Sequence, residues 1–114
     1  MDCIFCKIVQ KELNSEIVFE NDNIVGFNDI NPVAPYHILF VPKKHIDRLT
    51  NTELADINLL GELIYQAKEY AKKINIDISG YRLVFNTGKD AGQAVFHIHL
   101  HLIGGRMMSW PPGW

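Results

Sequence analysis

The sequence lacks several features that would assign the protein to a specialised class. Its formal net charge is −2 and its pI is about 6.2, whereas a dedicated nucleic-acid-binding protein normally carries a basic face. No apolar run approaches the ~20 residues that a membrane-spanning helix needs. The first residues also lack the basic and apolar segments of a signal peptide. We therefore expect a cytoplasmic protein with no dedicated nucleic-acid binding and no membrane association.

Internal repeats, low-complexity segments and linkers are absent as well. The chain has 114 residues, of which 47% are hydrophobic, and this suits one globular domain with a single modest core. We expect residues 1–114 to form that one domain.

Cysteine is scarce, but its two occurrences are close together. Cys3 and Cys6 form a C-x-x-C motif. In a reducing compartment a disulfide framework is improbable, which leaves metal binding, redox chemistry or a pair of buried thiols. Redox chemistry is the weakest of these, because a thioredoxin-like motif would follow a strand of a βαβ unit.

Apolar alternation and helical periodicity predict the secondary structure. Residues 4–9 favour a short helix, and residues 51–74 favour one long amphipathic helix with Thr50 and Glu53 as its capping box. Strands are expected at residues 17–20, 24–28, 36–42, 81–86 and 95–103. This order predicts an α+β fold, a mostly antiparallel five-stranded sheet with the long helix packed on one face.

The last of these strands contains three of the five histidines. His97, His99 and His101 alternate with aliphatic residues, so a strand would place all three imidazoles on one face, about 6.6 Å apart. Imidazole is both a base and a nucleophile near neutral pH. The arrangement predicts chemistry at one phosphate or metal. The alternatives are a polar strand facing solvent and a cloning tag, and a tag does not fit because the residues between are of core type.

The motif His97-x-His99-x-His101, followed by two hydrophobic residues, resembles the signature of the histidine-triad (HIT) nucleotide-binding superfamily. Further segments along nearly the whole chain are similar to its Hint branch. These segments are Cys3–Ile8, Asp29–Pro32, Ala34–Pro35, Val41–His45 and Trp110–Gly113. The resemblance implies a single HIT domain over residues 1–114.

The resemblance also implies an activity. It implies a homodimer whose two sheets join, and a hydrolase or transferase acting at the α-phosphate of purine nucleoside 5′-phosphoramidates or related esters. His99 matches the family's nucleophile, which forms a covalent nucleotidyl-histidine. His101 would contact the phosphate, helped by His37, and no metal is required for this chemistry.

A set of nucleotide contacts follows from the same resemblance. Asp29 matches the acid that binds both ribose hydroxyls, and the alternative for that residue is a helix or turn cap, although no helix follows it to be capped. The apolar members match the pocket around the base, although from sequence alone ordinary core is favoured. The expected contacts are Ile4, Phe5, Ile8, Phe27, Asp29, Ile30, Asn86, Gln93, Val95, His99 and His101.

The branch resemblance further suggests a structural zinc held by Cys3, Cys6, His45 and His97. Such a Cys₂His₂ set is closed, so the metal would be structural. The alternative is a pair of buried, metal-free thiols with His45 as a loop residue.

The sequence departs from the family's pattern at Ala94, where the family commonly has a serine that donates to the leaving group. This departure predicts a reduced rate. Trp110 either reaches the partner's active site in a dimer or packs with the tail.

Three alternative functions remain open. The protein could be a dinucleoside polyphosphate hydrolase, or a regulatory module that binds nucleotides and hydrolyses them slowly. It could also be a metalloenzyme that uses the three histidines of the motif as ligands.

Overall fold

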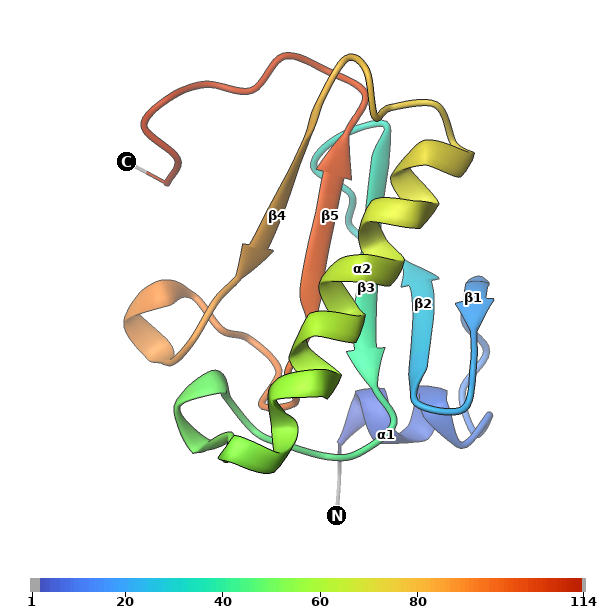
Figure 1. The fold of residues 1–114 in the computed structure, drawn as a ribbon, viewed down its shortest axis with the longest axis vertical. Helices are drawn as coiled ribbons and strands as arrows, with labels where there is room; N and C mark the ends of the chain where they lie inside the picture. Colours follow the sequence, from blue (N-terminus) through green and yellow to red (C-terminus); the bar gives the residue numbers. More distant parts are fainter. Residues whose placement is uncertain (1–2, 114) are drawn as a thin grey trace.

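Five strands form one antiparallel sheet in the computed structural model, which describes residues 3–113. The strand order is β1-β2-β3-β5-β4, so β4 and β1 are the two edges (Figure 1). The expected α+β fold is confirmed. The elements are α1 (Ile4–Val9), β1 (Ile17–Glu20), β2 (Ile24–Asn28), β3 (Tyr36–Pro42), α2 (Ile57–Lys73), β4 (Tyr81–Phe85) and β5 (Leu100–Gly104), with 3₁₀ turns at Leu49–Asn51, Leu54–Asp56 and Lys89–Ala91.

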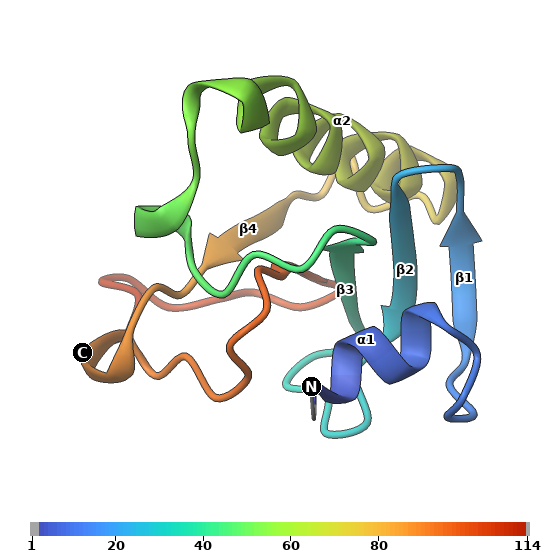
Figure 2. The ribbon, with the colours of Figure 1, turned by 90° about the horizontal axis from the view of Figure 1, so that it is seen from below.

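The two helices lie on opposite faces of the sheet (Figure 2). On one face Leu63, Ala67 and Ala71 of α2 pack against buried residues of β2, β3 and β5. On the other face Phe5 and Ile8 of α1 pack in a smaller cluster with Val25, Phe27, Leu39 and Val41. Alternation along β2 and β3 supplies both cores, because successive side chains of a strand point to opposite faces. The smaller cluster fixes the short helix beside the site described below.

The long helix begins later than the sequence suggested. The predicted start near residue 51 with Thr50 and Glu53 as capping box is wrong: α2 begins at Ile57, and the reciprocal cap joins Glu53 and Asp56. The Asp56 carboxylate accepts from the backbone N–H of Glu53 at 2.9 Å and also binds Lys44 Nζ at 2.8 Å. The ion pair with Lys44 holds the Asp56 carboxylate in place and so favours the Glu53–Asp56 cap over the predicted Thr50–Glu53 cap. None of the helices described between residues 3 and 113 is long and apolar enough to cross a membrane.

The histidine strand is shorter than predicted. The sequence favoured a strand over residues 95–103, but β5 begins only at Leu100, so His97 and His99 precede it. The N–H of Ile98 donates to Ile46 O in the loop after β3, and His97 Nε2 lies 2.8 Å from Pro42 O. These bonds replace the regular ladder beyond the Leu100–Phe40 pair. The three imidazoles still lie on the side of the sheet that carries α1, since Phe5 packs edge-on against both His97 and His99, and His99 packs against His101.

Candidate active site and metal site

A cavity of about 430 Å³ lies between α1, β2, β3 and the segment that leads into β5. His99 and His101 form part of its wall, and apolar side chains form most of the rest. A pocket of this size with a few polar groups suits a small organic ligand. The lining residues are Ile4, Phe5, Ile8, Leu13, Asn14, Ser15, Phe27, Asn28, Asp29, Ile30, Asn31, Leu39, Asn86, Gly92, Ala94, Val95, His99 and His101.

A backbone hydrogen bond fixes the orientation and the tautomer of the His99 ring. Its Nδ1 lies 2.8 Å from the carbonyl oxygen of His97. Since a carbonyl only accepts, Nδ1 carries the proton and Nε2 keeps a lone pair. The ring is buried, and burial lowers the pKa of His99. Phe5 packs edge-on against this ring at 5.0 Å between centroids.

His101 lies beside His99, with ring centroids 5.0 Å apart. Its Nδ1 is 2.9 Å from Nε2 of His37, a buried residue of β3. The Nε2 atom of His101 is buried and has no hydrogen-bond partner within the described chain. Burial, together with the neighbouring His99 and His37, lowers the pKa of His101 to about 4. His101 is therefore neutral at pH 7, and its free Nε2 requires a ligand atom or water.

Asp29 follows β2 and borders the cavity. Its Oδ1 accepts from the backbone N–H of Asn31 at 2.8 Å, and its Oδ2 lies 3.4 Å from His37 Nε2. The side chain is 18% exposed. Asp29 therefore closes a turn, in line with the alternative of a turn cap, and also lines the cavity.

Of the expected nucleotide contacts, all but Gln93 line the cavity. The Gln93 side chain is buried instead in the loop before β5. Its oxygen accepts from the N–H of Gly88 at 2.8 Å, and its amide donates to the carbonyl of Asp47 at 2.7 Å. Gln93 thus holds the loop that carries the neighbouring Gly92 and Ala94 to the cavity.

The cavity also contains residues that the sequence analysis missed. Leu13, Asn14 and Ser15 belong to the irregular connection between α1 and β1, where no periodicity gives a signal. Leu39 had a signal, since it lies two residues from His37 on β3 and therefore on the same face.

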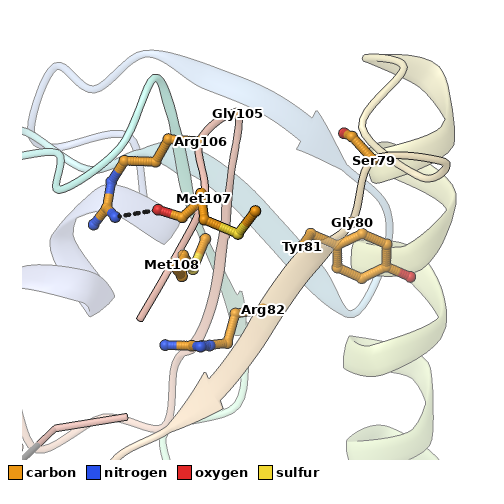
Figure 3. Close-up of a pocket in the computed structure, with 8 residues that line it drawn as sticks. All are labelled: Ser79, Gly80, Tyr81, Arg82, Gly105, Arg106, Met107 and Met108. Carbon is orange, nitrogen blue, oxygen red and sulfur yellow. Dashed lines mark hydrogen bonds between the residues drawn. The ribbon is translucent and has the colours of Figure 1, made fainter. Parts of the chain in front are cut away.

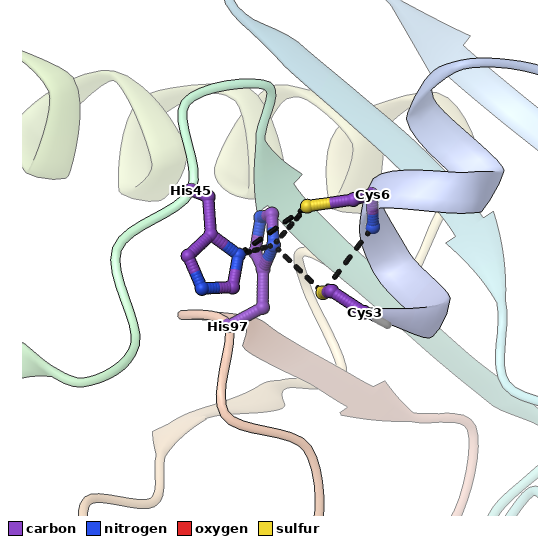
Figure 4. Close-up of side chains that lie close together, drawn as sticks. All are labelled: Cys3, Cys6, His45 and His97. Carbon is purple, nitrogen blue, oxygen red and sulfur yellow. Dashed lines mark hydrogen bonds between the residues drawn. The ribbon is translucent and has the colours of Figure 1, made fainter. Parts of the chain in front are cut away.

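A second cluster lies at the start of α1 (Figure 4). It brings together Cys3, the N-cap of α1, Cys6 within α1, His45 of the loop after β3, and His97. Nδ1 of His97 lies 3.3 Å from Cys3 Sγ and 3.6 Å from Cys6 Sγ. Nδ1 of His45 lies 3.3 Å from Cys6 Sγ and 3.1 Å from Nδ1 of His97. The four expected metal ligands are therefore within reach of one ion.

The chemistry of this donor set fits zinc. Bonds of ~2.0–2.3 Å in a tetrahedral zinc site set ligand-to-ligand distances of roughly 3.3–3.8 Å, close to those of the cluster. His97 lies with Nε2 2.8 Å from Pro42 O, so Nε2 donates and the lone pair of Nδ1 faces the thiols. Burial, with the adjacent Cys3, raises the pKa of the Cys6 thiol. A bound cation would offset this by stabilising the thiolate.

Asp29, His37 and His101 also lie close enough to hold a metal, but their hydrogen bonds fit one less well. A metal-bound imidazole normally donates its second N–H to an acceptor. The second nitrogen of His37, Nδ1, instead accepts from the backbone N–H of Val33. Because His97 belongs to the cysteine cluster, the three histidines of the motif do not surround one point. The metalloenzyme alternative therefore gains no support.

Another hollow, of about 440 Å³, lies where the start of β4 meets the tail after β5 (Figure 3). Its polar groups include two arginines, but Arg82 donates to the carbonyl of Ser109 and Arg106 to that of Met107. Among the described residues that line this hollow there is no histidine, cysteine or acidic side chain, in contrast to the first cavity, which His99 and His101 line.

Comparisons with known proteins agree with this geometry. The family model described as HIT domain matches residues 10–108. The chain is 47% identical to the 14 kDa zinc-binding protein of Brassica juncea, over 98% of this chain and 100% of that protein. It is also 47% identical to adenylylsulfatase HINT1 of Arabidopsis thaliana, over 96% of this chain and 76% of that protein. The crystal structure of a HIT family hydrolase from Legionella pneumophila matches with a TM-score of 0.97 and 49% identity, covering 98% of this chain and 100% of that chain.

Proposed function

Because this chain belongs to the HIT family, we propose that it is a nucleotide hydrolase that cleaves at the α-phosphate of purine nucleoside 5′-phosphoramidates or related esters. One observation carries the proposal: His99 directs Nδ1–H to the carbonyl of His97, which leaves the lone pair of Nε2 for a phosphorus atom in the cavity. The similarity to an adenylylsulfatase supports a substrate with an adenylyl group.

The reaction has two displacements at phosphorus. In the first, His99 Nε2 forms a bond to the α-phosphorus while the bond to the leaving amine breaks, and the amine takes up a proton from solvent. In the second, water attacks the nucleotidyl-histidine and releases a proton to solvent, the N–P bond breaks, and the nucleoside monophosphate leaves with His99 Nε2 regaining its lone pair. Such transfer depends chiefly on positioning and on neutralising the phosphate oxygens. His101 supplies one group to those oxygens from its buried Nε2.

The cavity suits the rest of a nucleotide. Asp29 and Asn86 both line it. In this proposal the Asp29 carboxylate accepts from the two ribose hydroxyls and Asn86 contacts the phosphate. Phe5 and Phe27, whose ring centroids are 5.4 Å apart, offer apolar surface to the base together with Ile4 and Ile8. Apolar faces discriminate poorly between bases, so either purine should bind.

The proposal is tested by intact-mass analysis after mixing with an adenosine 5′-phosphoramidate. The expected result is a transient adenylyl adduct that maps to His99. A protein that binds the nucleotide tightly without any adduct and without turnover would instead be the regulatory module. A clear preference for dinucleoside polyphosphates over phosphoramidates would favour that hydrolase class.

Replacing Ala94 by serine should raise turnover, by about 10-fold if the hydroxyl donates to the leaving group. Ala94 lines the cavity, and its backbone position is held by the buried Gln93 beside it. The measurement is kcat for a phosphoramidate, with Ala94→Cys as a variant of similar size and weaker donor strength. An unchanged or lower rate in the serine variant would remove the role assigned to this position.

The metal in this proposal is a structural zinc at Cys3, Cys6, His45 and His97. The donor set and its distances support it, as does the similarity to the zinc-binding protein of Brassica juncea. All four coordination positions are protein atoms, so the ion would tie α1 to the loop after β3 and would take no part in the reaction.

The active form in this proposal is a homodimer. Ile57, Ile64 and Tyr65 leave an apolar stripe exposed on the outer face of α2, and β4 is an unpaired edge of the sheet among the described strands. Trp110 is 81% exposed, so it does not pack onto its own chain. In a dimer it could contact the partner's cavity, as the family resemblance implies.

Ile64→Glu tests the dimer because the helix tolerates glutamate while a contact between two apolar stripes does not. We expect light scattering to report a dimer for the wild type and a monomer for Ile64→Glu at micromolar concentration. Ile64→Leu should remain dimeric. A wild-type monomer at all concentrations would contradict the proposal.

A further inference from the structure

The loop between β2 and β3 contacts the side chain of His37 through a backbone amide. The N–H of Val33 lies 3.2 Å from Nδ1 of His37, and it donates this hydrogen bond. The Val33 side chain is 55% exposed, so the amide rather than the side chain makes the contact. Earlier residues of the same loop, Asp29 to Asn31, line the cavity.

This amide determines which nitrogen of His37 carries a proton. A backbone N–H only donates, so Nδ1 of His37 has to offer its lone pair. Burial lowers the pKa of His37, and a neutral ring has one proton. That proton is therefore on Nε2, which faces Nδ1 of His101 at 2.9 Å and Oδ2 of Asp29 at 3.4 Å. Both neighbours are acceptors.

The tautomer of His37 in turn determines the tautomer of His101. Its Nδ1 accepts from His37, so the single proton of a neutral His101 is on Nε2. This Nε2 is the buried atom that has no partner within the described chain, and the His101 ring lines the cavity. His101 therefore carries a buried, unpartnered N–H donor on a ring that lines the cavity. A negatively charged phosphate oxygen is the acceptor that would satisfy it best.

We propose that the backbone amide of Val33 is a positioning group for phosphate binding: through His37 it fixes His101 with Nε2–H as a donor to a phosphate oxygen. The inference rests on the proposed function, because it assumes that the α-phosphate occupies the cavity. It explains why one His-His pair and one loop amide lie in series beside the nucleophile. Neither the motif nor its spacing assigns a role to Val33.

The opposite proton order would harm the reaction. His37 with a proton on Nδ1 would direct it at the Val33 N–H, and His101 would then present a lone pair to the phosphate. Replacing a donor by a lone pair removes one stabilising hydrogen bond from the transition state, where such bonds are worth roughly 10²–10³-fold in rate. The ground-state complex is stabilised less, so the effect falls mainly on kcat.

The first test is the tautomer of each histidine in the zinc-loaded wild-type protein, read from long-range ¹H–¹⁵N correlations at pH 7. We expect His37 and His101 both to carry the proton on Nε2, and His99 to carry it on Nδ1. A proton on Nδ1 of His37 or His101 would overturn the inference without any assay of activity.

The second test removes the amide hydrogen. Val33→Pro lacks the N–H, whereas Val33→Ala keeps it and changes only an exposed side chain. We expect Val33→Pro to show mixed tautomers at His37 and His101 and to lose about 10–100-fold in kcat with KM nearly unchanged. Val33→Ala should match the wild type. Altered tautomers with an unchanged kcat would refute the positioning role, and if Val33→Pro does not fold, the wild-type spectrum still decides the proton order.

The two proposals fail differently. If the tautomers are as expected but inorganic phosphate and adenosine monophosphate leave the His101 Nε2–H resonance unshifted, the donor does not meet phosphate and the inference fails. If those ligands shift it but no adenylyl adduct forms with a phosphoramidate, the positioning inference stands for binding and the proposed hydrolase activity fails.

Discussion

Replacing His99 by alanine is expected to reduce turnover of an adenosine phosphoramidate by ~10⁴-fold or more, because the nucleophile itself is removed. Nucleotide binding should change only a few-fold, since most of the cavity wall belongs to other residues. The Phe5 ring loses its edge contact with His99, which accounts for a modest loss of affinity. The measurements are kcat from steady-state kinetics, the dissociation constant of adenosine monophosphate, and the intact mass, in which the adduct should be absent.

His101→Ala is the matched variant on the same segment. It should lose about 10²–10³-fold in kcat, since it removes a donor to the phosphate, yet the adduct should still form at His99. If His99→Ala keeps its turnover, a metalloenzyme is favoured over nucleophilic histidine catalysis. The same holds if EDTA abolishes the turnover of the wild type without unfolding it.

The sheet could be predicted from the sequence because its pattern is local. Alternation marked β1, β2 and β3 with the bounds that the structure shows, and β4 differs by one residue. Pro42 ends β3 as expected, since proline cannot donate to the ladder. These features depend on neighbours a few residues apart, so the chain alone reveals them.

The histidine segment could not be predicted in full because its geometry depends on distant partners. The alternation of His97, His99 and His101 favoured one continuous strand. In the fold, His97 Nδ1 lies near Cys3 Sγ and His97 Nε2 near Pro42 O, while the N–H of Ile98 donates to Ile46 O. The regular hydrogen bonding of β5 with its neighbouring strands therefore starts only at Leu100. Two motifs of the sequence, C-x-x-C and H-x-H-x-H, thus share His97, and neither motif reveals that alone.

The candidate site also has a part that could be expected before the structure and a part that depends on contacts between distant residues. Its apolar wall was expected only through the family resemblance, because Ile4, Phe5 and Ile8 would otherwise be ordinary core. The hydrogen bonds of Gln93 and Val33 each join a side chain to a backbone group, Gln93 Nε2 to Asp47 O and the Val33 N–H to His37 Nδ1, and no residue-type pattern encodes such bonds. The tautomers of the histidines follow from these bonds and are therefore visible only in the folded chain.

Cys3→Ser is expected to remove the zinc and to lower the melting temperature by roughly 10–20 °C. The reason lies in α1, which has only six residues and is too short to be stable by itself. The metal would tie this helix to His45 and His97, which are distant in sequence. Elemental analysis should report one zinc per chain in the wild type and none in the variant, and calorimetry gives the melting temperature.

Loss of the metal should also weaken nucleotide binding, by about 10-fold, although no metal ligand side chain touches the reacting phosphorus in this proposal. Ile4, Phe5 and Ile8 of α1 form one wall of the cavity, so a frayed helix exposes that wall to water. The measurement is the dissociation constant of adenosine monophosphate by calorimetry, for the loaded protein, the EDTA-treated protein, and the treated protein after zinc is restored.

Lys7→Ala is the control on the same helix, because it changes α1 without changing a ligand of the metal. It should keep one zinc and bind the nucleotide as the wild type does. EDTA should have no further effect on Cys3→Ser, since its stability no longer depends on a metal. A wild-type protein that is free of zinc and yet has the full melting temperature would show that Cys3 and Cys6 are buried thiols, and that packing alone holds α1 against the sheet.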